Sequence, residues 1–280
     1  MRATVIASSL LIACVQSPDT GETSTDVSAP RVLRGVDRAS AFSAHEAHVL
    51  ASQHGVKWSG VYIGGACDGG SGWTRHVVAS IHAATGWRFL PIFVGQQSPS
   101  ICGANELGYH RGHLDGEATA NRMRAFGWYA NRGIPVALDV EAGTYEYSPG
   151  GSTEYVRGWV AAVHGAGYRA YVYSSPYGVS HFHDEGVHAD AAWVASYFYS
   201  GFRNVTPADL HQIGGRYAHH ARAWQYAGDF YVDGVGRVDA NTSDLVLAPA
   251  PGGTNRAHAA QDEDTADGEP EVDADEQLAE

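Results

Sequence analysis

Apolar segments with the length of strands alternate with amphipathic segments of helical spacing between residues 31 and 249. Short runs rich in β-branched and aromatic residues, bounded by turn residues, are typical of buried strands. The strands that this pattern predicts are 32–37, 58–64, 88–94, 134–141, 168–174, 191–197, 221–226 and 235–241. The helices that it predicts are 43–55, 74–84, 115–131 and 152–164, with a further helix start at Pro176 and a short helical turn at 207–212. Ser43 and Glu46 form a capping-box pattern at the start of the first helix.

The order of these elements predicts an α/β fold, an irregular TIM-type (β/α) barrel. About five βα units are followed by three strands with few helices, which indicates a closed, parallel-type barrel with a degenerate second half. The roughly 220 residues of this part lie at the low end for an eight-stranded barrel. An open doubly wound sheet is the alternative architecture. No GxGxxG motif follows the first strand, so a dinucleotide site has no support.

The segment 134–141 has the most informative pattern in the chain. Alternate side chains of a strand lie on opposite faces. One face is bulky and apolar, as expected of a strand covered by helices, and consists of Ile134, Val136, Leu138 and Val140. The other face is small and then acidic, ending in Asp139 and Glu141, as expected of a barrel interior that opens into a polar mouth. Two carboxylates at this spacing can form an acid–base pair, and the alternative interpretation is a strand that runs into an acidic loop.

Further polar residues stand at the predicted strand ends, where barrels of this type carry their catalytic residues. These residues are Asp37, Tyr62, Asp139, Glu141, Tyr173, Gln225, Asp239 and Asn241. The first and last strands of a closed barrel are neighbours, so Asp37 and Asp239 can converge across the mouth from the other two carboxylates. Four carboxylates on one rim cannot all ionise cheaply, so at least one pKa should rise. A carboxyl group with a raised pKa can remain a proton donor near neutral pH.

Five short motifs follow one another along the same strands. They are Gly35-Val36-Asp37, Asp139-Val140-Glu141, Tyr171-Val172-Tyr173-Ser174, Trp224-Gln225-Tyr226 and Val238-Asp239-Ala240-Asn241. In this ordered set, residues 31–247 resemble glycoside hydrolase family 25, the muramidases of the Chalaropsis lysozyme type. The chain is more similar still to their relatives, the bacterial glycoside-hydrolase-like domains of unknown function. The resemblance implies an irregular barrel of the kind read from the pattern above.

The resemblance also implies roles for the carboxylates. In the lysozymes, the glutamate of the Asp-x-Glu pair is the general acid, which corresponds to Glu141. Asp139 would then stabilise the positive charge that develops at the sugar or orient the N-acetyl group, and Asp37 and Asp239 would line the same site. The residues expected to bind substrate are Tyr62, Tyr173, Trp224, Gln225 and Asn241. The chain departs from the lysozymes at Arg38, where they usually carry an apolar residue, and in the loops 67–73 and 98–113.

The N-terminus predicts export. Met1-Arg2 precedes an apolar run that ends in Leu11-Ile12-Ala13-Cys14, which resembles a bacterial lipobox. We therefore expect residues 1–14 to be a signal peptide with a lipidated Cys14, and the polar residues 15–30 to be a disordered tether. An ordinary cleaved signal with an incidental cysteine is the alternative. The expected location is the bacterial cell envelope, on its periplasmic or extracellular face.

The net charge of −13 comes mostly from the other end of the chain. Residues 261–280 contain ten acidic side chains and no Lys or Arg, so the segment 250–280 is expected to be a disordered acidic tail. The remaining residues carry 18 basic against 21 acidic side chains, a charge of −3. No basic run marks a nucleic-acid-binding surface, and we expect no nucleic-acid partner.

The cysteines and histidines complete the candidate chemistry. With Cys14 lipidated, Cys67 and Cys102 remain, an even number in an exported protein, and the loops that carry them can meet in a disulfide. Neither cysteine has the spacing of a zinc site. The pairs His181/His183 and His219/His220 could in principle bind a metal, but we expect solvated loop histidines, no metal and no cofactor.

These observations lead to a glycoside hydrolase-like protein that cleaves a cell-wall-type, peptidoglycan-like glycan by acid–base hydrolysis. One alternative is a non-catalytic barrel that binds a glycan or wall component, although a pure binder needs no proton donor. The other is a metal-dependent hydrolase that uses the histidine-rich loops.

Overall fold

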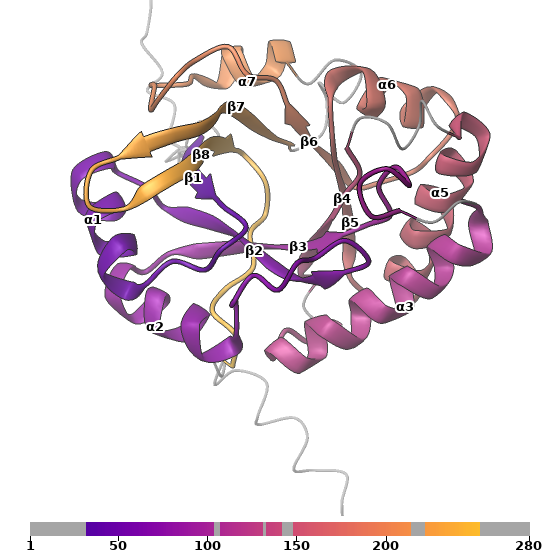
Figure 1. The fold of residues 1–280 in the computed structure, drawn as a ribbon, viewed down its shortest axis with the longest axis horizontal. Helices are drawn as coiled ribbons and strands as arrows, with labels where there is room; N and C mark the ends of the chain where they lie inside the picture. Colours follow the sequence, from indigo (N-terminus) through magenta and orange to yellow (C-terminus); the bar gives the residue numbers. More distant parts are fainter. Residues whose placement is uncertain (1–31, 104–106, 131–132, 142–147, 214–221, 253–280) are drawn as a thin grey trace, which may run out of the picture.

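Eight strands close into one barrel in chain order, β1 to β8 (Figure 1). The computed structural model describes residues 32–103, 107–130, 133–141, 148–213 and 222–252. The strands are β1 (Leu33–Asp37), β2 (Trp58–Gly65), β3 (Arg88–Val94), β4 (Pro135–Asp139), β5 (Arg169–Ser174), β6 (Ala191–Ala195), β7 (Arg222–Val232) and β8 (Gly236–Ser243). The helices are α1 (Ala44–His54), α2 (Arg75–Thr85), α3 (Tyr109–Phe126), α5 (Pro149–Gly165), α6 (Pro176–Asp184) and α7 (Pro207–Ile213).

The structure confirms the irregular α/β barrel and corrects the direction of its last strand. Strands β1 to β7 pair in parallel, whereas β8 is antiparallel to both β7 and β1. The physical reason is that β7 continues to Val232, which pairs with Gly236, so that residues 233–235 form a tight hairpin turn. Parallel neighbours need a long crossover, and a connection of this length permits only an antiparallel pair.

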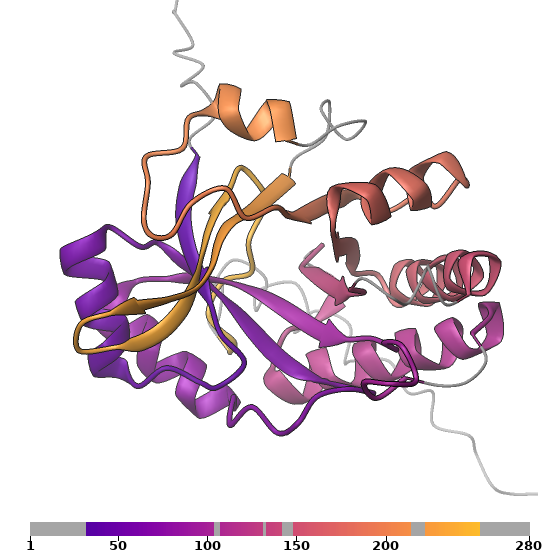
Figure 2. The same ribbon diagram turned by 45° about the horizontal axis from the view of Figure 1, so that its top comes forward.

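The helices pack in separate groups around the outside of the barrel. Figures 1 and 2 show α1 and α2 together on one side, α3 and α5 packed side by side on another, and the short α7 near β7. The predicted capping box of α1 is present, since Ser43 accepts from the Glu46 backbone N–H and the Glu46 carboxylate accepts from the Ser43 backbone N–H.

The predicted start and end of α3 were wrong. The helix begins at Tyr109 rather than residue 115 and ends before Gly127, whose φ of 87° closes it. A β-carbon on Gly112 would lie 1.8 Å from the Tyr155 carbonyl oxygen, and one on Gly158 would lie 2.0 Å from the Tyr109 carbonyl oxygen. Glycine, which usually argues against a helix, here permits the close approach of α3 and α5.

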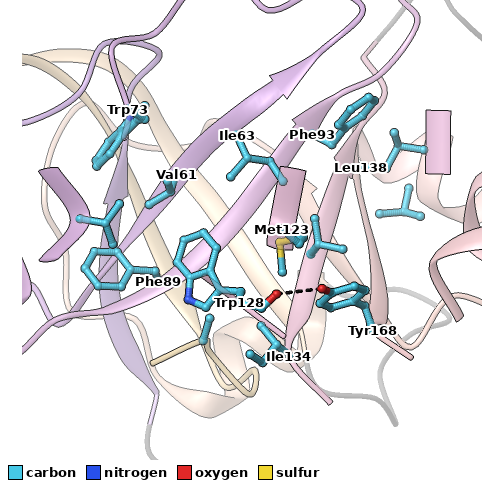
Figure 3. Close-up of a cluster of buried hydrophobic side chains, with 14 of the residues drawn as sticks. Val61, Ile63, Trp73, Phe89, Phe93, Met123, Trp128, Ile134, Leu138 and Tyr168 are labelled. Carbon is cyan, nitrogen blue, oxygen red and sulfur yellow. Dashed lines mark hydrogen bonds between the residues drawn. The ribbon is translucent and has the colours of Figure 1, made fainter. Parts of the chain in front are cut away.

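The alternation predicted for β4 is confirmed. Its bulky residues belong to the core between strands and helices, where Leu138 and Ile134 lie in the same cluster as Met123 (Figure 3). In this cluster the Tyr168 hydroxyl donates to the Trp128 carbonyl oxygen over 2.8 Å. The small residue Ala137 faces a separate core inside the barrel, which also contains Trp58, Leu90, Ile92, Tyr171 and Trp193.

Several expectations lie outside the described residues. They are the signal peptide 1–14 with Cys14, the tether 15–30, the acidic tail apart from residues 250–252, and the His219/His220 pair. Within the described ranges, the helices lack the length and apolar character needed to cross a membrane.

Candidate active site

The four predicted carboxylates come from three strands. Asp37 ends β1 and pairs in register with Asp239 of β8, while Asp139 ends β4 and Glu141 follows two residues later. Asp239 was expected here because it would end a parallel strand. It reaches the mouth for a different reason: β8 runs the other way, so its first half lies beside the end of β1.

Gln225 of β7 joins the carboxylates to two tyrosines. Its Oε1 accepts hydrogen bonds from the hydroxyl groups of Tyr173 at 2.5 Å and Tyr197 at 3.0 Å. Its Nε2 donates to Asp37 Oδ2 at 3.2 Å and to Asp239 Oδ2 at 3.0 Å. Both ends of the amide are therefore used, which fixes its orientation and ties β7 to β1, β5 and β8.

Asp37 is the most enclosed of the four carboxyl groups, with 1% of its surface exposed. Tyr62 donates to its Oδ1 at 3.1 Å, and Asn241 donates to its Oδ2 at 2.6 Å. Burial, followed by the nearby charge of Asp239, raises the pKa of Asp37 to about 8, although the hydrogen bonds from Asn241, Tyr62 and Gln225 oppose this shift. Asp37 therefore holds a proton at neutral pH.

Asp139 and Glu141 differ in their exposure. Asp139 is buried, and its Oδ1 has no hydrogen-bond partner among the described residues. Burial, then the charges of Glu141 and Asp37, raise the pKa of Asp139 well above its ordinary value. Glu141 is exposed at the rim, and partial removal of its surrounding water raises its pKa. Burial is also the main cause of the raised pKa of Asp239, so the pKa of each of the four carboxyl groups is shifted upward.

Gln97, in the loop after β3, is a site residue that the sequence analysis missed. Its Nε2 donates to the Asp139 carbonyl oxygen at 3.0 Å, and its Oε1 accepts from the Glu141 backbone N–H at 3.0 Å. These two bonds hold the backbone of the carboxylate pair in place from the neighbouring strand. Tyr197, on the loop after β6, was missed too. Gln97 comes shortly after the predicted strand 88–94, and Tyr197 is the last residue of the predicted strand 191–197, so these positions could have indicated both residues.

A cavity of about 180 Å³ lies beside the carboxylate pair. Its lining residues are Cys67, Val94, Gln97, Ile101, Cys102, Asp139 and Glu141. Cys67 and Cys102 form a disulfide, as predicted, that joins the loop after β2 to the loop after β3. The disulfide is therefore part of the wall of this cavity.

Replacing both cysteines, as Cys67→Ser/Cys102→Ser, should lower the free energy of unfolding by about 3–4 kcal/mol, because the link closes a loop of 35 residues in the unfolded chain. Urea denaturation without reductant measures the change. Reduced wild type is the control and should match the variant. Equal stability of the variant and oxidised wild type would contradict this account.

Four of the five predicted substrate-binding residues lie at or just below the mouth: Tyr62, Tyr173, Gln225 and Asn241. The fifth, Trp224, does not lie with them. It neighbours Gln225 in β7 and so points to the outer face, where it is buried against Phe198 and Tyr226. Because side chains alternate along β7, Gln225 lies on the inner face and Trp224 does not. We therefore leave Trp224 out of the site.

The histidines predicted in a loop lie on a helix. His181 and His183 are both in α6, and the His181 ring is 3.1 Å from the Thr153 hydroxyl. The described part of the chain holds no group of three or more His, Cys, Asp or Glu side chains arranged to bind a metal ion.

Residues 49–243 match the family described as the Rv2525c-like, glycoside hydrolase-like domain. The chain belongs to this family. A comparison with curated proteins gave no match. The Rv2525c-like domain also has the fold of several solved structures, among them the Tat-secreted protein Rv2525c of Mycobacterium tuberculosis, determined with L-tartrate. That structure is 16% identical with a TM-score of 0.51, and the match covers 76% of this chain and 95% of the other.

Two further matches are to pneumococcal proteins. The modular autolysin LytC of Streptococcus pneumoniae is 17% identical with a TM-score of 0.51, and the match covers 76% of this chain but only 47% of LytC. GHIP of Streptococcus pneumoniae, a glycosyl hydrolase 25, is 14% identical with a TM-score of 0.51, and the match covers 78% and 87%. At these identities the similarity shows a shared fold, that of the family 25 lysozyme-like enzymes.

Proposed function

We propose that this protein is an exported glycoside hydrolase that cleaves a cell-wall-type, peptidoglycan-like glycan by acid–base hydrolysis. The observation that carries the proposal is the Asp139–Glu141 pair. Asp139 is buried, and one of its carboxyl oxygens has no hydrogen-bond partner among the described residues, whereas Glu141 is exposed at the rim; both line one cavity. Paired titratable groups in unlike environments are typical of acid–base sites.

Glu141 is the proton donor in this proposal. It is exposed, so a glycosidic oxygen can approach it, and its raised pKa favours the protonated form that a general acid needs. The proton passes to the leaving oxygen as the glycosidic bond breaks. Water then adds to the anomeric carbon and releases its proton to a carboxylate of the site. Asp139 lies deeper, where its carboxyl can stabilise the positive charge that develops at the sugar or orient an N-acetyl group.

Asp37 and Asp239 support the pair from the far side of the mouth. Because Asp37 keeps a proton near neutral pH, it adds little negative charge beside Asp139. Its bonds to Tyr62 and Asn241 hold it in a fixed position. The substrate class rests on analogy with LytC, an autolysin that has also been determined with a synthetic peptidoglycan ligand.

A non-catalytic glycan-binding barrel is the second candidate. The observation that favours it is the family match, whose description is glycoside hydrolase-like and specifies no activity. Digestion of purified peptidoglycan by the intact protein, with analysis of the sugar ends released, distinguishes the two. New reducing ends support hydrolysis, and binding without any new ends supports the second candidate.

We also propose that the protein is anchored to the envelope through a lipid on Cys14. The disulfide supports a location outside the reducing cytoplasm. The relative Rv2525c is described as Tat-secreted, which agrees with export. In this proposal residues 1–14 are the signal peptide, 15–30 the tether, 31–249 the barrel and 250–280 the acidic tail.

Metabolic labelling with a fatty-acid analogue should mark wild type and leave Cys14→Ser unlabelled. Several acyl chains anchor firmly, whereas one binds membranes marginally, so the variant should also leave the membrane fraction. Cys67→Ser/Cys102→Ser is the matched control and should keep its label. Equal labelling of wild type and Cys14→Ser would exclude lipidation at this cysteine.

A further inference from the structure

A second, larger cavity of about 650 Å³ lies beside the starts of β1, β2 and β3 and is bordered by β7 and β8. Arg34, Lys57 and Arg88 line it at the starts of β1, β2 and β3, and Arg203 lines it from the loop after β6. The carboxylates of the mouth stand at the other ends of β1 and β4. Among the described residues that line this basal cavity there is no Asp or Glu.

The basic side chains are brought together by strand pairing. The Lys57 backbone N–H donates to the Arg34 carbonyl oxygen at 2.9 Å, and the Arg88 N–H donates to the Lys57 carbonyl oxygen at 3.1 Å. Arg203 joins them because Arg34 donates to its carbonyl oxygen at 3.2 Å. These residues are far apart in the sequence, so no basic run indicated the cavity.

The four cations are not equally available to a ligand. Arg34 is held by the carbonyl oxygens of His54 and Arg203 and by Asn204 Oδ1. Lys57 and Arg88 are exposed, and neither side chain has a hydrogen bond or ion pair to the described residues. The guanidinium of Arg203 lies 4.1 Å from the centre of the Tyr199 ring and is exposed as well.

Like charges around one cavity repel each other, and a bound anion removes that repulsion. The C-terminal ends of α1 and α2, at Gly55 and Gly86, also border the cavity and offset part of the positive charge. Lys57 and Arg88, whose side chains have no partner among the described residues, remain available to a ligand, with the exposed Arg203 beside them. The guanidinium group of arginine can donate two hydrogen bonds to phosphate oxygens, and the ammonium group of lysine can pair with their negative charge. Asn204, whose Oδ1 already accepts from Arg34, has its amide N–H groups left to donate.

We propose that the basal cavity binds a phosphate ester group. Its volume exceeds that of a bare phosphate and leaves room for a glycerol-type substituent. The cavity also lies where the expected tether joins the barrel, since the tether ends at residue 30 and Val32 lines the cavity. The same group occurs in soluble phosphate esters and in the headgroups of anionic lipids, and the two sources can be separated by experiment.

The test uses the full chain with Cys14→Ser, so that no acyl chain contributes to vesicle binding. Calorimetry measures the affinity for sn-glycerol 3-phosphate, with glycerol as the uncharged probe. Co-sedimentation measures binding to vesicles of phosphatidylglycerol and phosphatidylcholine against phosphatidylcholine alone. The cavity variant is Lys57→Gln/Arg88→Gln. The matched control is Arg122→Gln/Arg124→Gln, which removes two exposed charges from α3.

The cavity variant should bind glycerol 3-phosphate about tenfold more weakly than its parent, while the control stays within about twofold. Both variants should keep the parent's melting temperature, because all four side chains are exposed. If the parent prefers phosphatidylglycerol vesicles and the cavity variant loses this preference, the ligand is a lipid headgroup. If the parent binds the soluble ester but not the vesicles, the ligand is a free phosphate ester. No binding of either probe by the parent, or equal losses in both variants, overturns the proposal.

Discussion

Glu141→Gln is expected to slow glycan cleavage by a factor of about 10²–10⁴ while leaving glycan binding and melting temperature nearly unchanged. Glutamine keeps the size and hydrogen-bonding capacity of the side chain but has no proton to give to the leaving oxygen. The fold should tolerate the change because the side chain is exposed and the bond that holds this residue to Gln97 comes from its backbone. Paired assays of peptidoglycan cleavage and binding measure the two effects separately.

Two further variants sharpen this test. Glu185→Gln, an exposed glutamate just beyond α6, is the matched control and should retain full activity. Asp139→Asn should also slow turnover, since an amide cannot offset a developing positive charge. It should not destabilise the fold, because burial raises the pKa of Asp139, so the ionised carboxylate costs folding free energy that a neutral asparagine avoids. Loss of activity without loss of stability would separate a catalytic role from a structural one.

The cleavage and binding assays on these variants also distinguish a glycoside hydrolase from a non-catalytic glycan-binding barrel. Full activity of Glu141→Gln would remove this residue from the mechanism. A wild type that binds several wall glycans without cleaving them, with weaker binding by either variant, would favour the binding barrel.

The sequence was most informative where one local pattern had one structural solution. The alternation in 134–141 placed Leu138 in the helix-facing core and Ala137 inside the barrel, as the structure confirms. The Ser43/Glu46 capping box marked the start of α1 to the residue. Asp37 and Asp239 were expected to converge, and they pair directly, although the direction assumed for β8 was wrong.

The predicted boundaries and strand direction were wrong where a residue type is compatible with two different local structures. Residues 98–113 were assigned to a loop, but α3 begins at Tyr109, and Gly112 permits its close contact with α5. The Asp233-Gly234 pair is a hairpin signal, and using it would have joined the predicted strands 221–226 and 235–241 as an antiparallel hairpin. Gln97 and the basal cavity depend on contacts between loops and strand starts distant in the sequence. No local periodicity encodes such contacts, so only the folded chain reveals them.

The wild type is expected to lose stability as the pH rises from about 4 to about 8, and Asp37→Asn should remove much of that loss. The pKa of Asp37 is about 8 in the folded protein, against 3.8 as its ordinary value. Between these values the folded state holds a proton that the unfolded state has released. Raising the pH therefore favours unfolding over this window, and the stabilising effect of the proton is complete only below about pH 4.

Asparagine stays neutral at every pH, and it suits the site. Its carbonyl oxygen can accept from Asn241 and Gln225, and its amide can donate to the Tyr62 hydroxyl oxygen in place of the present bond. The variant should match wild type near pH 4 and exceed it by about 2–5 kcal/mol at pH 8. Urea denaturation at pH 4, 6 and 8 measures both proteins, and Asp233→Asn, in the exposed β7–β8 turn, is the control that should follow wild type. A difference between Asp37→Asn and wild type that stays constant over this range would show that Asp37 is ionised in the folded protein, and the proton assigned to it would have to lie elsewhere among the four carboxyl groups.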